Sequence, residues 1–212
     1  MNLTRKPLLT LLAAIAAASA LQGCIPVIVG GTGMAVAMAS DRRSSGTYVE
    51  DEGIEWKANK WIGDRLGDKV HVNATSFNRK LLLTGEAFNE ASRDEAGRLA
   101  AAVDNVREVV NELRVAPTST ISARTNDSYI SSKVKARFVD QKDFHIPHVK
   151  VVTEAGTVFL MGLVSQREGD AATEIARTTS GVQKVVRVFE YISEDEVKRL
   201  DSAIRPADSN PR

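Results

Sequence analysis

The sequence predicts an α+β fold made of two tandem αββαβ units, each with a three-stranded mixed sheet packed against two helices. The main observation behind this prediction is an internal repeat of apolar and turn residues. Three landmarks recur: Val72 as Val149 and Gly85 as Gly162, both shifted by 77 residues, and Val106 as Val182, shifted by 76. A repeat of this length, with helix and strand patterns in the same order, indicates a duplicated domain.

Two different periodicities predict the first helix and the hairpin of each unit. The apolar stripe of the helix consists of Ile54, Ala58, Trp61 and Ile62 in the first unit, and of Ile130, Val134 and Phe138 in the second. Alternating apolar residues then predict a hairpin in each unit. The first hairpin is expected to turn at Asn78-Arg79 and the second at 154–157.

A second helix and a final strand complete each unit. In the second unit, the helix is expected to begin behind Ser165-x-x-Glu168, a capping box in which the hydroxyl and the carboxylate satisfy free backbone donors. The final strands are expected at 106–115 and 182–192. The first unit is thus predicted to span 48–116 and the second 125–193.

The chain begins with the features of a secretory signal. Arg5 and Lys6 precede an apolar run, 8–20, that is too short to cross a bilayer. Leu21-Gln22-Gly23-Cys24 follows and resembles the lipobox of bacterial lipoproteins, in which the cysteine is acylated and becomes the first residue. We therefore predict a signal peptide over 1–23 and a lipid anchor at Cys24. By the same resemblance, Ile25 in place of an aspartate implies the outer membrane.

Two segments outside the units are predicted to lack regular structure. Residues 24–47 are expected to form the lipidated cysteine and a tether, which is polar and mobile over 41–47. Residues 194–212 are expected to form a C-terminal tail, disordered from Ser202 onward, where two prolines fall.

Composition and residue pattern argue against nucleic-acid binding and catalysis. Lys and Arg number 28 against 27 Asp and Glu, so no net charge attracts a polyanion. Cys24 is the only cysteine, and its acylation would exclude disulfides and thiol catalysis. His71 is expected on the polar face of its strand, and His145 and His148 in a solvated loop. We therefore expect no metal site, no cofactor and no enzymatic activity.

The repeated unit resembles the BON domain family. The resemblance rests on Gly-Thr-Val-Phe-Leu-Met-Gly at 156–162 and Gly-Val-Gln-Lys-Val at 181–185, with Ala171, Ala172 and Ala176 between them. Together with the lipobox and 126–134, these residues make the chain similar to outer-membrane lipoproteins with two BON domains. The resemblance implies a protein without enzymatic activity that faces the periplasm and supports envelope integrity. It also implies enrichment at the division site and a link to the outer-membrane protein assembly machinery.

The first helix of the second unit carries the candidate site. Tyr129, Lys133 and Arg137 form a row with four-residue spacing, and no acid lies between Ser128 and Val139. A basic helix edge with an exposed aromatic residue suits an anionic lipid surface. The resemblance implies that this helix binds anionic phospholipid, through Tyr129, Ser132, Lys133, Lys135, Ala136 and Arg137. Two alternatives stay open: a solvated helix face with Tyr129 packed over the domain edge, and a chaperone-like or interaction protein for outer-membrane protein assembly.

Trp56 is a second candidate site residue. It falls opposite the apolar stripe of the first unit's first helix, so we expect it to be exposed. Two explanations are open for such a residue: contact with the second unit, or contact with a partner or a membrane.

Overall fold

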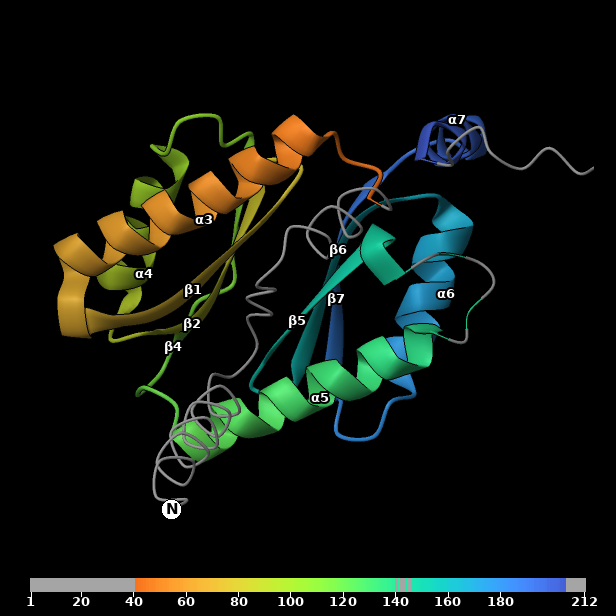
Figure 1. The fold of residues 1–212 in the computed structure, drawn as a ribbon. Helices are drawn as coiled ribbons and strands as arrows, with labels where there is room; N and C mark the ends of the chain where they lie inside the picture. The colour runs from red at the N-terminus through yellow and green to blue at the C-terminus, as the bar shows by residue number, and fades with distance from the viewer. Residues whose placement is uncertain (1–40, 140, 142–143, 145, 205–212) are drawn as a thin grey trace, which may run out of the picture. The chain divides into compact units, whose positions relative to one another are not determined.

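The computed structural model describes residues 41–139, 141, 144 and 146–204, and it confirms two tandem α+β domains (Figure 1). The first domain contains α3 (Ser45–Leu66), η1 (Gly67–Lys69), β1 (Val70–Phe77), β2 (Lys80–Ala87), α4 (Glu90–Ala101), β3 (Glu108–Asn111) and β4 (Arg114–Val115). The second contains α5 (Ile121–Val139), η2 (Ile146–His148), β5 (Val149–Glu154), β6 (Thr157–Val164), α6 (Gln166–Arg177) and β7 (Lys184–Tyr191). A further helix, α7 (Glu194–Ile204), follows them.

Both sheets have the predicted mixed topology. In the first sheet β2 pairs antiparallel with β1 and parallel with β3 and β4, and in the second β6 pairs antiparallel with β5 and parallel with β7. Both hairpins turn where expected, and Asn78, Arg79, Ala155 and Gly156 adopt the left-handed conformation of tight hairpin turns. The predicted capping box at Ser165 and Glu168 is present at the start of α6.

The last strand of the first domain differs from the prediction of one continuous strand over 106–115. It is divided into β3 and β4 because the Leu113 amide donates to the Asn111 side chain at 3.3 Å instead of to β2. The Leu113 side chain is buried in the domain core. A side-chain acceptor within the strand thus competes with the sheet for a backbone donor.

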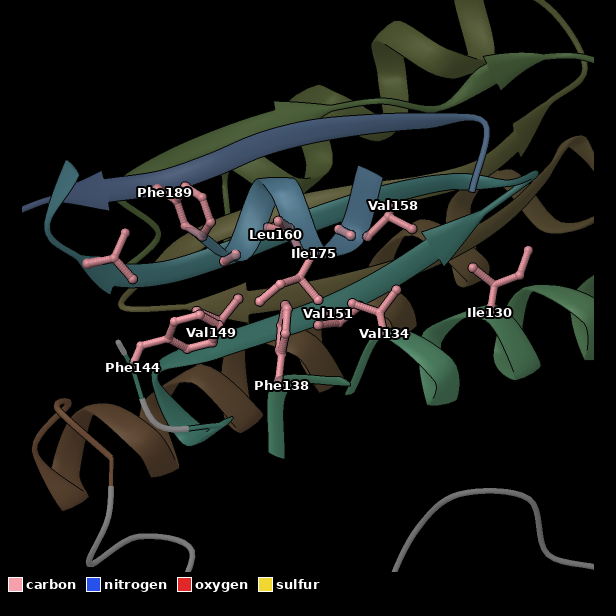
Figure 2. Packing of buried hydrophobic residues seen from close by; sticks show 13 residues of the cluster. Ile130, Val134, Phe138, Phe144, Val149, Val151, Val158, Leu160, Ile175 and Phe189 are labelled. Atoms are coloured by element: carbon pink, nitrogen blue, oxygen red, sulfur yellow. The ribbon is translucent and has the colours of Figure 1, made fainter. Parts of the chain in front are cut away.

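Each domain has its own core between its helices and one face of its sheet. Figure 2 shows the second core, where Ile130, Val134 and Phe138 of α5 face Val151 and Leu160 of the sheet. In the first core Ile54, Ala58 and Ile62 are buried as predicted. Trp61 is not, since 38% of it is exposed. It lies about 100° around the helix from Ile62, at the edge of the stripe, where the sheet no longer covers it.

The opposite faces of the two sheets share a third apolar cluster. Phe77 and Leu82 of the first sheet pack with Phe159, Met161 and Leu163 of the second. Because side chains alternate along a strand, Leu82 enters this cluster while Leu81 and Leu83 enter the first domain's core. Both faces of β2 and β6 are therefore buried, which explains the consecutive apolar residues 81–83 in β2 and 158–161 in β6.

The segments predicted as tether and tail are partly folded. Arg42, in the predicted mobile stretch, is 5% exposed and bonds to Glu168 of α6, and Ser44 begins the first helix as its N-cap. The predicted tail begins with α7, so the expectation of disorder is wrong for Ser202–Ile204. This helix has acids in its first turn, favourable to the helix dipole, and the Glu196 amide donates to the Ser193 hydroxyl at 3.2 Å.

Within the described residues, none of the helices combines the length and apolar character needed to span a bilayer. The predicted signal peptide, Cys24 and residues 205–212 lie outside the described part of the chain.

Candidate functional site

The position of α5 is set by its buried side. Ile130, Val134 and Phe138 pack into the core, and Asp127 points to the hairpin turn. Its carboxylate accepts the backbone N–H groups of Ala155 at 2.9 Å and Gly156 at 2.8 Å. The helix and the hairpin are thereby held in register by a charge-assisted pair of hydrogen bonds.

The first domain repeats this arrangement with Asp51. Its carboxylate accepts the N–H groups of Asn78 and Arg79, both at 2.8 Å, and the residue is only 1% exposed. Neither acid was expected to bind a hairpin turn. The signal was present, because Asp51 and Asp127 are 76 residues apart, the same offset that relates parts of the two repeats.

The exposed side of α5 carries more apolar residues than the row of Tyr129, Lys133 and Arg137 predicted. Tyr129 is 62% exposed, and Ile121 and Val139 near the two helix ends are 79% and 64% exposed. Ser132 and Ala136 lie exposed on the same side and are small, so the larger side chains project beyond them. Tyr129 is therefore mostly exposed and not packed over the domain edge, and a solvated helix face stays open as the alternative to lipid binding. Ile121 and Val139 were missed, although both lie opposite the core stripe of the helix.

The three predicted cations lie on α5 but differ in whether they bond to the rest of the domain. The Lys133 ammonium donates to the Ser180 carbonyl and lies 4.7 Å from the centre of the Tyr129 ring. Arg137 donates from Nη1 to the Ile175 carbonyl at 2.8 Å and to two threonine hydroxyls near the end of α6. Lys135 is exposed and takes part in no ion pair among the described residues. Arg137 therefore has a structural role at the C-terminal end of α6, and Lys135 is the cation most available to a ligand.

The N-terminal end of α5 is fastened to the first domain through His71. Arg124 of α5 donates to Nε2 of His71 at 3.0 Å, and Nδ1 of His71 lies 3.2 Å from the Glu86 carboxylate. An arginine can only donate, so Nε2 accepts and the Nδ1 proton is donated to Glu86. His71 thus lies on the polar face of its strand, as expected, and is half-buried there in a network of charged side chains.

A second acid lies close to this network. Burial raises the pKa of Glu154, the carboxylates of Glu86 and Asp127 raise it further, and a hydrogen bond from Asn73 opposes them. The Asn73 amide reaches the Glu154 carboxylate at 3.4 Å and joins the two domains.

We predict that Glu154→Gln raises the melting temperature at neutral pH. The pKa of Glu154 is raised in the fold, so its contribution to stability is full below the unfolded-state pKa and is lost as pH rises through the folded pKa. Glutamine keeps the shape of the side chain and an oxygen for Asn73. Thermal denaturation from about pH 4 to pH 8 should show that the increase in melting temperature grows with pH. An increase that is equal at every pH would contradict the raised pKa of Glu154.

The remaining histidines do not form a metal site in the described part of the chain. His148 is 2% exposed and 3.9 Å from Asp201 of α7, so the expectation of a solvated residue is wrong. His145 lies outside the described residues. Among those that are described, no three histidine, aspartate or glutamate side chains cluster as metal ligands would.

Trp56 lies on α3 and is 65% exposed, as predicted. The second domain does not cover it, which removes that explanation for the residue. A contact with a partner or a membrane is the explanation that stays open.

Comparison with known proteins agrees with this architecture. The model of the BON domain matches residues 58–117 and 126–193. The chain is 38% identical over 193 residues to "Outer membrane lipoprotein DolP" of Haemophilus influenzae, covering 90% of this chain and 100% of that protein. It is 35% identical to "21 kDa hemolysin" of Actinobacillus pleuropneumoniae, over 72% of this chain and 79% of that one. Identity to "Osmotically-inducible protein Y" of Escherichia coli is 28%, over 69% and 75% of the two chains. This chain therefore belongs to the BON domain family and carries two copies of the domain.

Proposed function

We propose that this protein is an outer-membrane lipoprotein, anchored through an acylated Cys24 and facing the periplasm, whose second BON domain binds anionic phospholipid through α5. The relative named as an outer-membrane lipoprotein, which matches this chain over 90% of its length, supports the location. The lipobox supports the anchor. Enrichment at the division site and support of envelope integrity would follow from the lipid preference and from the anchored position.

The exposed face of α5 carries the lipid-binding proposal. It combines three projecting apolar side chains, Ile121, Tyr129 and Val139, with cations on either side. The one acid of the helix, Asp127, is buried and bonded to the hairpin turn, so no exposed carboxylate on α5 repels an anionic surface. Aromatic and aliphatic groups enter the headgroup boundary while the cations meet the phosphates.

The expected affinity of the domain by itself is weak. Each cation near an anionic surface contributes about 1 kcal/mol, so three of them with one ring give an interaction in the millimolar range. A lipid anchor makes such an affinity sufficient, because it holds the domain at a high effective concentration near the membrane.

We predict that Tyr129→Ala with Lys135→Glu abolishes binding of residues 25–212 to anionic vesicles while the fold is retained. Both side chains are exposed, and the change removes the ring and reverses the charge that has no partner within the described structure. Lys133 and Arg137 are left intact, because their hydrogen bonds to the rest of the domain would confuse loss of binding with loss of structure. Cosedimentation with anionic and with zwitterionic vesicles measures the effect.

The matched control is Trp61→Ala with Arg65→Glu, which changes an exposed aromatic residue and an exposed cation on α3. This control should bind anionic vesicles as the parent does. Binding that persists at high salt, or that the control loses and the α5 variant keeps, would contradict the proposal. The first outcome would favour the alternative of a chaperone-like protein that binds clients through apolar surface.

A further inference from the structure

The exposed face of α3 has a pattern that the lipid-binding proposal does not use. Within about 60° of Trp56 around the helix lie seven other residues, all exposed: Ser45, Val49, Glu52, Gly53, Asn59, Lys60 and Gly63. Val49 is 61% and Trp56 65% exposed, so two large apolar side chains project from this face. The core residues of α3 lie on the opposite side of the helix.

Neither packing among the described residues nor backbone conformation requires glycine at the two glycine positions of this face. A methyl group added at Gly53 or Gly63 would meet no atom within 4 Å, and neither residue needs a left-handed conformation. Glycine within a helix lowers its stability relative to alanine. The glycines therefore lower the stability of α3, and they leave hollows on its exposed face on either side of Trp56.

The face is self-complementary when two copies of α3 run antiparallel. With Trp56 on the two-fold axis, residues at equal distances before and after it come to the same level. Glu52 then lies at the level of Lys60 of the second copy, so opposite charges meet, and symmetry makes this contact twice. Val49 meets the hollow at Gly63 of the second copy, and each Trp56 ring can lie over the partner's helix beside its Gly53.

We propose that α3 is a self-association surface, through which two copies of this chain pair antiparallel about Trp56. Tryptophan is a frequent energetic centre of protein interfaces, and the charges around it specify the antiparallel arrangement. In the single chain Lys60 pairs with Asp64 at 2.5 Å, but both side chains are about half exposed or more, so this surface pair exchanges readily for Glu52 of the second copy. A contact through one helix face is small, and association is therefore expected to be weak and dependent on local concentration.

Zero-length coupling of the native side chains tests the proposal. A carbodiimide activates the Glu52 carboxylate, the Lys60 amine displaces the activated group, and an amide forms with net loss of water, taken up by the carbodiimide as the urea. Within one helix the two residues are eight positions apart, about 12 Å along the axis, so a zero-length bond between them must join two copies. The full-length chain in intact cells is treated, and the dimer is digested and mapped by mass spectrometry. We expect an amide between Glu52 and Lys60.

Charge reversal provides the matched variants. Glu52→Lys leaves two amines at this contact and Lys60→Glu leaves two carboxylates, so neither single variant can form the amide, and like charges also oppose the pairing. Both are therefore expected to lose the cross-link between residues 52 and 60. The double variant Glu52→Lys/Lys60→Glu restores both contacts with the signs exchanged and should recover the parent yield. Reversal of the exposed pair Glu174→Arg/Arg177→Glu on α6 should leave the yield unchanged.

The proposal is overturned if no amide joins residues 52 and 60, or if the double reversal does not restore the dimer. It is also overturned if these residues couple only to other polypeptides, which would make the face a docking site for a different protein. The Tyr129→Ala/Lys135→Glu variant, which tests the lipid site, should still give the Glu52–Lys60 amide, so a failure of one proposal is distinguishable from a failure of the other.

Discussion

Leu160→Asp is expected to unfold the second BON domain. Leu160 is 0% exposed in the centre of β6, between β5 and β7, and faces the helices of its domain (Figure 2). An unpaired carboxylate placed there costs several kcal/mol, a large part of the total stability of about 5–15 kcal/mol of a domain this size. Circular dichroism during urea denaturation measures the loss, as a missing or strongly shifted transition.

Lys184→Asp is the control for this prediction. Lys184 begins β7 in the same sheet and is exposed, so an aspartate there remains solvated. Its denaturation midpoint should stay close to that of the parent. Similar midpoints for the two variants would show that the side of β6 assigned to the core is wrong.

Arg42→Met is expected to destabilise the chain by about 3–5 kcal/mol, as the loss of one member of a buried ion pair does. The Arg42 guanidinium donates two hydrogen bonds of 2.8 Å to the Glu168 carboxylate and a third to the Leu163 carbonyl. It also pairs with Asp201 of α7 at 2.8 Å. Glu168 is 2% exposed, so removing Arg42 leaves a buried carboxylate without its cation.

A compensating change makes this prediction specific. Adding Glu168→Gln removes the stranded charge and keeps an acceptor for the Ser165 amide, which bonds to Glu168 at 2.8 Å. The double variant should therefore be more stable than Arg42→Met. Arg177→Met, which breaks an exposed pair with Glu174, should leave stability almost unchanged. Urea denaturation of the four proteins checks the order, and a double variant less stable than Arg42→Met would contradict the role given to the buried charge.

The pair of Arg42 and Glu168 also predicts that the stability of the chain depends on pH. Burial by itself raises the pKa of Glu168, but hydrogen bonds from Arg42 and the Ser165 amide lower it more, so its pKa lies below the ordinary value. The stabilisation is therefore present above the unfolded-state pKa and is lost as pH falls through the folded pKa. In Arg42→Met the largest of the lowering interactions is gone, so this part of the acid sensitivity should be reduced.

Arg42 and its neighbour also hold the segment before the first domain in place. Its neighbour Arg43 pairs with Asp41 and with Asp51, the acid that holds the first hairpin turn, while Arg42 itself bonds to the second domain. The stretch expected to be a mobile tether from 41 onward is thus fastened to both domains. A soluble fragment that begins at Thr47 would lack these contacts, which is why the vesicle experiment uses residues 25–212.

The sequence by itself determined the duplicated αββαβ architecture, because each element depends on a local pattern. The stripe of Ile130, Val134 and Phe138, the alternation along the hairpins and the capping box at Ser165 act within a few residues of one another. The BON resemblance rested on the same local features. The placement of Tyr129 on an exposed helix face followed from helical periodicity in the same way.

Only the tertiary structure decided the roles of the charged residues. From the sequence, Asp51 and Arg42 would be expected on a solvated surface, as charged residues usually are. Both are buried, because hydrogen-bond partners far along the chain compensate their charges. Likewise, the sequence does not distinguish the cations Lys133, Lys135 and Arg137. The structure shows that Arg137 bonds to the end of α6, while Lys135 has no ion-pair partner among the described residues. The physical reason is that the cost of burying a charge depends on what lies opposite it, and that is set by contacts between distant segments.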